Sequence, residues 1–169
     1  CENICLVPRA LWRWGRSRSL SLEQIAALPL IRHERDLAQE TLDGLLARPA
    51  ASAVGALEVS FASTIAALVA LGEGAAVVDP FTAHTAKQLN TSVVTARIRT
   101  SLPFILYLLL PRRRLLSSRG AAFLCAFDAV CHQLRIDLTV QLLGPNGTVT
   151  SAEVTIADVI ERMDCNPRP

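Results

Sequence analysis

Short apolar runs recur along the first half of the chain, separated by segments with helical signals. The runs at residues 3–7, 29–31, 56–59 and 75–78 predict strands, because each is brief and ends at a proline or at polar residues. The last run is entirely apolar, which is typical of a strand buried on both faces of a parallel sheet. Residues 12–20, rich in arginine and serine, predict a loop.

Capping signals predict helices between these strands. Ser21 is expected to cap a brief helix that ends near residue 28, and apolar residues recur at helical spacing over 37–46. Gly72 can adopt the left-handed conformation that ends a helix, here one over 63–71, and another helix is expected over 82–89. Strands that alternate with helices of this length predict an α/β domain with a largely parallel sheet and helices on both faces.

The pattern changes in the last third of the chain. Residues 97–110 are expected to hold one or two further strands, and residues 119–134 a final helix. The apolar face of that helix comprises Ala122, Phe123, Ala126, Phe127 and Val130. Alternating segments at 136–142 and 149–156 flank a turn signal, which predicts a hairpin followed by a short helix.

Composition and charge exclude several classes of protein. The 169 residues are 51% hydrophobic, enough for one folded domain with an appendage. Glycines and Glu73 interrupt the longest apolar stretch, so no membrane span is predicted, and no export signal is recognisable, which predicts a cytoplasmic protein. Arginines cluster at positions 9–18 and 112–114, but no recognition helix carries them, so a solvated surface is favoured over a phosphate-binding one.

The motifs of common enzymes and metal sites are not found in the sequence. The three histidines and five cysteines fit no metal-ligand spacing, and the serines lack the flanking glycines of a nucleophile elbow. The segment Gly72-Glu73-Gly74 follows a predicted helix and precedes a strand, the reverse of a dinucleotide fingerprint. The sequence therefore predicts no catalytic residue, no cofactor and no metal.

Two turns from strand to helix remain as a candidate binding site. Residues 32–36 and 60–63 are expected at the carboxyl ends of their strands, where open α/β sheets bind ligands. Free helix N–H groups, hydroxyls and a guanidinium there suit a small anion. The pattern is equally compatible with ordinary polar loops.

One stretch of the chain resembles a recurring segment of LysR-type transcriptional regulators. The segment runs from Ala56-Leu57-Glu58-Val59 through Ser63, Ile65, Leu68 and Val69 to Gly72-x-Gly74 and Val77-Val78-Asp79-Pro80. Its continuation Asp79-Pro80-Phe81-Thr82-Ala83 resembles the branch that senses opines and basic amino acids. Segments at 4–8, 28–31 and 106–123 follow the family's order, so the resemblance covers about residues 3–134.

The resemblance implies a periplasmic-binding-protein-like lobe with the first lobe of the family mostly absent. Residues 3–110 would form the second effector-binding subdomain, and 111–134 the return helix that belongs to the first subdomain. Residues 135–169 would be an extension of unknown role with a hairpin-like tail, because family members usually end near residue 134.

The implied function is sensing of a small anionic or amino-acid-like effector in the cleft between two lobes. The intact regulator would be a homo-oligomer that binds DNA through a winged helix-turn-helix absent from this chain. The residues expected to contact the effector are Arg32, His33, Ser60, Phe61, Ser63, Phe81 and Thr82. The alternatives are a solute-binding protein of a transport system, which would need an export signal, and an α/β enzyme, for which no catalytic residues are recognisable.

Overall fold

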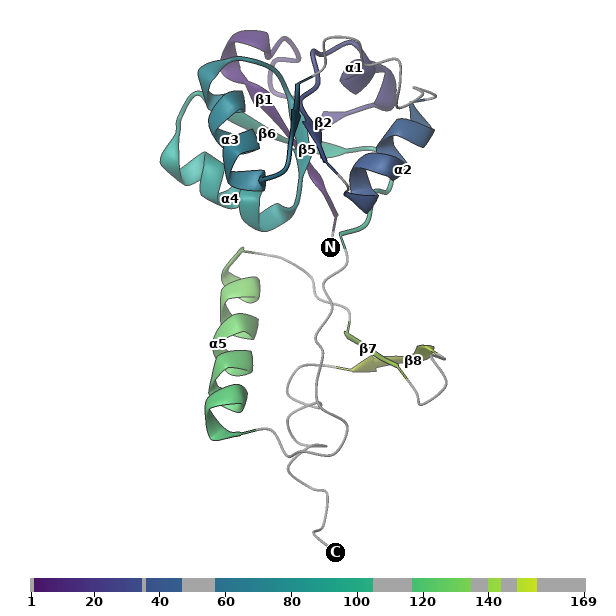
Figure 1. The fold of residues 1–169 in the computed structure, drawn as a ribbon, viewed down its shortest axis with the longest axis vertical. Coiled ribbons are helices and arrows are strands. Elements are labelled where there is room, and N and C mark those ends of the chain that lie inside the picture. Colours follow the sequence, from purple (N-terminus) through teal and green to yellow (C-terminus); the bar gives the residue numbers. More distant parts are fainter. Residues whose placement is uncertain are drawn as a thin grey trace, which may run out of the picture. The chain divides into compact units, whose positions relative to one another are not determined.

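The computed structural model describes residues 2–34, 36–46, 57–104, 117–134, 140–143 and 149–154 of the chain. The chain divides into two compact units, one formed by Glu2–Ile105 and the other by Leu106–Pro169 with Cys1 (Figure 1). Each unit is described by itself.

The first unit alternates strands with helices, as the sequence predicts. In chain order its elements are β1 (Ile4–Pro8), the 3-10 helix η1 (Arg9–Leu11), β2 (Ser19–Leu20), α1 (Leu22–Ala26), β3 (Arg32–His33), α2 (Leu37–Leu45), β4 (Glu58–Val59), α3 (Ala62–Leu71), β5 (Ala76–Val78), α4 (Pro80–Leu89) and β6 (Val93–Ile98). The α/β fold class is confirmed.

The strands of the first unit run in one direction, with the exception of β1. A sheet of order β2-β6-β1-β5 has β2 parallel to β6, whereas β1 is antiparallel to both β6 and β5. A second pair, β3 and β4, is parallel, and a parallel bridge from Leu30 to Ala75 joins this pair to the β5 side of the sheet. The backbone N–H of Ile31 donates to the Ala75 carbonyl at 2.8 Å in the same place. The sheet is thus mixed, because β2, β5 and β6 run in one direction and β1, paired with both β5 and β6, runs in the other.

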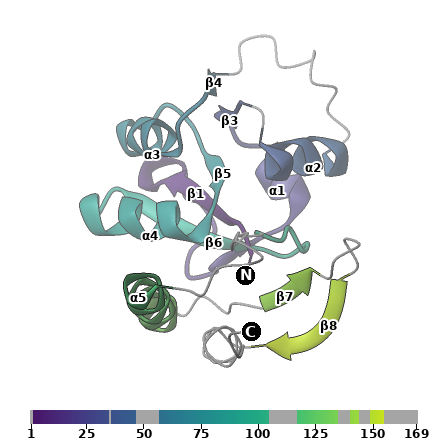
Figure 2. The same cartoon turned by 60° about the horizontal axis from the view of Figure 1, so that its bottom comes forward.

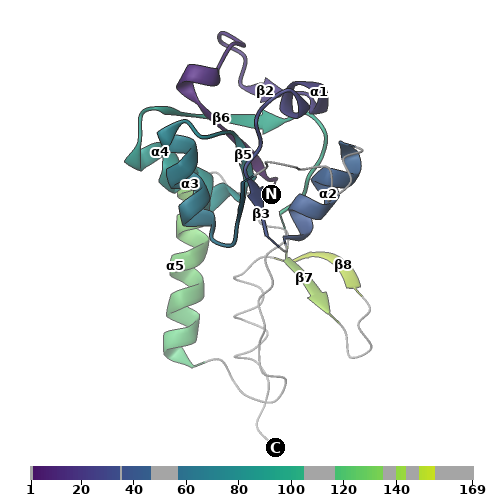
Figure 3. The ribbon, with the colours of Figure 1, turned by 45° about the horizontal axis from the view of Figure 1, so that its top comes forward.

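Helices cover both faces of the sheet, which gives the unit three layers (Figure 2). Successive residues of a strand point to opposite faces, so β1 sends Cys5 and Val7 to one apolar cluster and Leu6 to the other. Ile25 of α1 and Leu42 of α2 complete the first cluster. The second contains residues of α3 and α4, which lie side by side (Figure 3). The continuous apolar run at β5 is explained by burial on both faces.

The helix ends confirm the predicted capping residues. The Ser21 side chain accepts from the Gln24 N–H while the Gln24 side chain accepts from the Ser21 N–H, which together form a capping box at α1. Gly72 ends α3 in the left-handed region, at φ 93°. Pro80 is the first residue of α4, two positions earlier than predicted, because Asp79 caps this helix.

Three boundaries predicted from the sequence are wrong. Strand β6 occupies residues 93–98 instead of beginning at residue 97, because Val93 and Val94 are both buried and show no alternation. Strand β2 lies within the predicted loop, since residues 19 and 20 pair in parallel with Arg97 and Ile98 of β6. Arg32 and His33 pair with β4 and so extend their strand, where a turn was expected. The possible strand at 105–110 lies outside the described residues.

The second unit contains helix α5 (Ser118–Leu134) and the strands β7 (Val140–Leu143) and β8 (Val149–Val154). The two strands pair antiparallel, which confirms the predicted hairpin, whereas the short helix expected after it lies outside the described residues. The predicted apolar face of α5 is poorly packed, with Phe123 64% and Val130 44% exposed. In the parts of the chain that the structure describes, no helix is long and apolar enough to cross a membrane.

Candidate functional site

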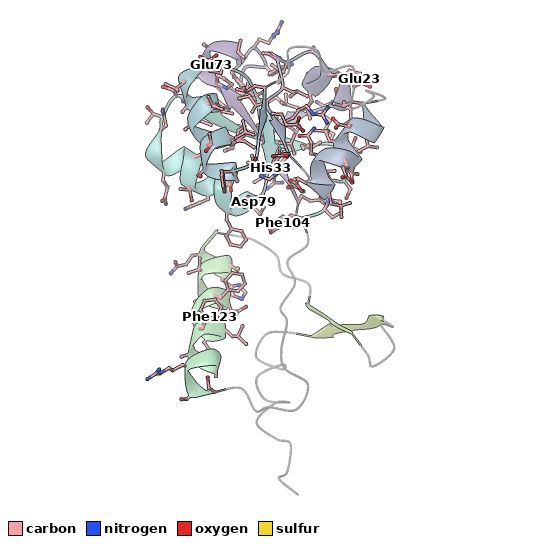
Figure 4. The ribbon with its side chains drawn as sticks, viewed as in Figure 1. Glu23, His33, Glu73, Asp79, Phe104 and Phe123 are labelled. Carbon is pink, nitrogen blue, oxygen red and sulfur yellow. The ribbon has the colours of Figure 1, made fainter. Side chains whose placement is uncertain are left out.

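The carboxyl ends of β3, β4 and β5 lie at one edge of the sheet. Parallel pairing of β3 with β4, and of Leu30 with Ala75 before β5, makes the three strands end on the same side. Each strand leads directly into a helix there, to α2, α3 and α4 respectively. Figure 4 shows His33 and Asp79 toward this end of the unit and Glu73, which precedes β5, toward the other. The three predicted loops therefore emerge at a common edge, the sheet edge that open α/β folds use for ligands.

The first two loops are joined by hydrogen bonds. The Glu34 N–H donates to the Val59 carbonyl at 3.0 Å, and this bond continues the pairing of β3 with β4 by one residue. The Ser60 hydroxyl then donates to the Glu34 carboxylate. A carboxylate is thus held beside the start of α3.

Arg32, a predicted ligand contact, has a partner within the protein. Its guanidinium forms an ion pair with Asp43 of α2, and the Arg32 side chain is only 13% exposed. Gln39, also on α2, donates to the other oxygen of Asp43 at 2.9 Å and accepts from the His33 N–H at 3.4 Å. Arg32 is therefore tied to α2, and its contact with an effector stays a prediction.

His33 lies where β3 ends. Its Nδ1 atom is 3.8 Å from a carboxylate oxygen of Asp36, the residue that caps α2. This nitrogen is buried and makes no hydrogen bond within the described part of the chain. The imidazole is thus next to the helix that begins at the candidate edge.

The three helix N-termini at this edge differ in how their backbone N–H groups are satisfied. Asp79 accepts from the N–H groups of Phe81 and Thr82, each at 2.9 Å, and from the Thr82 hydroxyl. Asp36 accepts from the Ala38 N–H at 3.0 Å. These carboxylates occupy the positions that an anion would take at α4 and α2.

Helix α3 has no such cap. Its N-cap residue is Phe61, which makes no side-chain hydrogen bond to the helix, and the first backbone bond of the helix runs from Ile65 N–H to the Phe61 carbonyl at 3.0 Å. The N–H groups of residues 62–64 thus have no protein acceptor among the described residues. With the exposed hydroxyl of Ser63 beside them, they form an anion-binding arrangement, next to the Ser60 hydroxyl that donates to Glu34.

Two aromatic side chains add apolar surface to this edge. Phe61 is 71% exposed, although it is a large hydrophobic residue. Phe81, at the start of α4, is half-buried and packs edge-to-face on Phe104, with ring centroids 6.1 Å apart. Exposed aromatic surface beside polar donors is typical of a site for a small organic molecule.

Sequence reasoning missed the acidic residues of this edge. Asp79 could have been found, because an acidic residue directly before a proline at the first helical position is a known capping signal. Glu34 fell in the predicted turn without being singled out. The pairing of Asp43 with Arg32 depends on how α2 packs on β3, for which the sequence holds no signal. Among the residues described here, no group of three or more His, Cys, Asp and Glu side chains could hold a metal ion.

An α/β lobe with polar loops at the carboxyl edge of its sheet is compatible with a small-molecule binding domain. Residues 2–132 match the family model of the LysR substrate binding domain. The chain therefore belongs to this family, the effector-binding domain of LysR-type transcriptional regulators, and its fold is periplasmic-binding-protein-like.

Among solved structures, a cysteine-to-serine mutant of OxyR from Corynebacterium glutamicum with hydrogen peroxide bound is similar to this chain. It shares 17% sequence identity at a TM-score of 0.48, over 60% of this chain and 33% of that chain. The chain thus spans about a third of the length of that protein. A comparison with curated proteins finds no match.

Proposed function

We propose that this chain senses a small amino-acid-like effector as part of a LysR-type transcriptional regulator. The single observation that carries the proposal is the uncapped N-terminus of α3 at the candidate edge, where the other two helices, α2 and α4, are capped by Asp36 and Asp79. A carboxylate of the effector would accept from the N–H groups of residues 62–64 and from the hydroxyl of Ser63, while the Ser60 hydroxyl holds Glu34 beside them.

The charges at the edge favour a zwitterion over a simple anion. Glu34, Asp36 and Asp79 place carboxylates around the loops, whereas the positive charge of Arg32 is already paired with Asp43. A ligand that carries only negative charge would meet repulsion from these carboxylates. An amino acid brings its own ammonium group, which can donate a hydrogen bond to the Glu34 carboxylate. This choice also agrees with the resemblance to the branch that senses opines and basic amino acids.

The other predicted contacts take supporting roles in this proposal. Phe61 and Phe81 would cover the apolar part of the effector, and His33 would donate or accept beside Asp36. Thr82 already donates its hydroxyl to Asp79 and would act by holding that cap in place. Arg32 would fix the direction of β3 through its ion pair with α2.

Sensing requires the ligand to favour one state of the regulator over another. In this proposal the remaining effector contacts come from a first lobe, and the ligand binds in the cleft between the two lobes. Binding shifts the equilibrium between two arrangements of the lobes. That shift would change the affinity of a cytoplasmic homo-oligomeric regulator for DNA. Residues 3–110 would be the second effector-binding subdomain in this scheme, and 111–134 a return helix of the first.

The test is a thermal-shift titration of the chain with free amino acids, their N-acetyl derivatives and the corresponding amines. We expect only compounds with both an ammonium and a carboxylate to raise the melting temperature. A contact from a hydroxyl to a charged group is worth about 1.5–3 kcal/mol, so Ser63→Ala should weaken binding at least about tenfold. The control is Ser92→Ala, an exposed serine before β6 at the opposite sheet edge, which should bind like the parent chain.

Two results would contradict the proposal. The first is that simple dicarboxylates raise the melting temperature of the chain more than any amino acid does. The second is equal binding by the Ser63 and Ser92 variants to a ligand that stabilises the parent chain.

A further inference from the structure

We propose that the loop after β1 and the end of β6, whose arginines the sequence favoured as a merely solvated surface, form a surface that binds the phosphate backbone of duplex DNA. This arginine surface comprises Arg13, Arg16 and Arg18 from the loop and Arg97 from β6. It shares no residue with the effector edge, and the inference is independent of which effector the chain binds.

In the part of the chain that the structure describes, the arginine surface has no compensating acid. No aspartate or glutamate occurs between Glu2 and Glu23 in the sequence, whereas arginine occurs at positions 9, 13, 16 and 18. The side chains of Arg13, Arg16, Arg18 and Arg97 are all exposed. Within the described ranges, none of the four forms an ion pair with a carboxylate. An exposed positive surface without paired acids attracts phosphate groups.

The fold brings the two parts of the surface together. Ser19 lies opposite Arg97 in the parallel pairing of β2 with β6, and the Arg97 N–H donates to the Arg18 carbonyl at 2.8 Å. Arg99 lies near but is excluded from the surface, because Glu23 carries a negative charge next to it. A hydrogen bond from the Ser21 side chain lowers the pKa of Glu23, and the positive charge of Arg99 adds a smaller effect.

The loop that carries three of the arginines is held in shape by its own contacts. The Trp12 indole N–H donates to the Gly15 carbonyl at 3.0 Å, and Gly15 has φ +56°, a conformation that other residues rarely adopt. Trp12 and Trp14 meet edge-to-face at 5.2 Å and pack on the apolar cluster around Cys5 and Val7. A loop fixed in this way loses little entropy when its arginines bind.

The same contacts favour duplex DNA over other polyanions. Single-stranded nucleic acid is held by aromatic side chains on which bases stack, and membrane surfaces by apolar residues that insert among lipids. Both tryptophans of this loop pack inward on the core, so the loop presents guanidinium groups without a stacking platform or an apolar wedge. Guanidinium donors suit the regularly spaced phosphates of a duplex. This choice rests on the proposed function, in which the chain is part of a regulator bound to duplex DNA.

The experiment measures binding of the 169-residue chain to a short fluorescent duplex of arbitrary sequence by anisotropy, over a series of salt concentrations and without effector. The variant is Arg16→Gln, Arg18→Gln and Arg97→Gln together, which leaves Arg13 on the face of Trp14, 5.8 Å from the ring centroid. The control, with the same loss of charge, is Arg112→Gln, Arg113→Gln and Arg114→Gln. Circular dichroism melting curves check that both variants fold.

We expect the parent chain to bind the duplex weakly. The logarithm of its association constant should fall steeply as the logarithm of the salt concentration rises. The arginine-surface variant should reduce the magnitude of that slope by about 2.7, since each of the three lost phosphate contacts removes about 0.9. The control should retain the slope of the parent chain. Equal losses in both variants would show that net charge alone is responsible and would overturn the proposal. Tighter binding to single-stranded DNA, or to phosphatidylserine vesicles, than to the duplex would overturn it in favour of that partner. Because no effector is present, the result does not depend on the test of effector sensing.

Discussion

At the scale of single residues, the role of a side chain depends on the partner that the fold gives it. Arg32 was predicted to bind an effector because it lies near a strand end, yet Asp43 on the next helix already pairs with it. Asp79 was passed over, although it organises the start of α4 through three hydrogen bonds. Residue type and local spacing could indicate the polar edge. They could not show which of its charges are available to a ligand.

Burial separates the cysteines of the chain in a way that can be measured. Cys5 is completely buried in the first unit, and burial raises its pKa to about 12. Cys125 of α5 is exposed. Because the thiolate is the reactive form, iodoacetamide at mildly alkaline pH should alkylate Cys125 rapidly and Cys5 only after denaturant is added. Peptide mass spectrometry of the quenched samples distinguishes the two sites, and equal rates at Cys5 and Cys125 in the folded chain would contradict the packing of β1.

At the scale of elements, the sequence located helices better than strands. The ends of α1 and α3 follow from Ser21 and Gly72, because a capping residue acts on backbone groups only a few positions away. Strands β2 and β6 were misplaced for the opposite reason. Two residues of β2 are strand only because β6 lies beside them, and the buried start of β6 carries no alternating pattern.

The missing cap of α3 leads to a prediction that links stability to binding. Phe61 has extended backbone angles, φ −118° and ψ 126°, as a capping residue requires, and its ring is mostly exposed. An aspartate at this position could accept from the N–H groups that we assign to the effector carboxylate. Phe61→Asp should therefore raise the free energy of unfolding by about 1 kcal/mol and weaken binding of amino acids.

Phe61→Ala is the matched control for this prediction. It removes the same ring but supplies no acceptor, so it should not raise stability, and it should weaken binding only through loss of apolar contact. Urea unfolding followed by circular dichroism measures the stabilities of both variants. An aspartate variant that is less stable than the alanine variant would show that the N–H groups of residues 62–64 are not available for capping.

At the scale of the whole molecule, the sequence could predict the α/β class and the order of the elements, but not the direction of β1. Alternation of strands and helices is a local pattern, whereas β1 is set antiparallel by partners more than seventy residues away, Val78 and Arg97. The same alternation could predict helices on both faces of a sheet, and the resemblance to a regulator family added that this sheet belongs to one lobe of a two-lobed domain. The division into two units depends on long-range contacts of the same kind.

The first unit is closed by contacts between its two ends. The Asn3 N–H donates to the Leu102 carbonyl at 2.9 Å, and the Asn3 side-chain amide donates to the carbonyls of Leu102 and Pro103, each at 3.1 Å. The Glu2 carboxylate accepts from the Leu102 N–H at 2.7 Å. Leu102 itself is buried in the cluster between the sheet and helices α1 and α2. These contacts make residues 99–104 part of the fold, although they form no strand.

A pair of truncations tests whether this closure makes the unit self-sufficient. A fragment of residues 2–105 contains both apolar clusters and the contacts of Asn3, so it should fold with a single cooperative thermal transition. A fragment of residues 2–99 leaves Asn3 without its partners and opens the cluster that Leu102 fills. The exposed apolar surface alone costs about 2 kcal/mol, a large fraction of the 5–15 kcal/mol that stabilises a typical domain. The shorter fragment should therefore melt at a clearly lower temperature than the longer one. Equal melting temperatures would show that the contacts of residues 100–105 with Glu2 and Asn3 contribute nothing to stability. An unfolded 2–105 fragment would show that this unit depends on the rest of the chain.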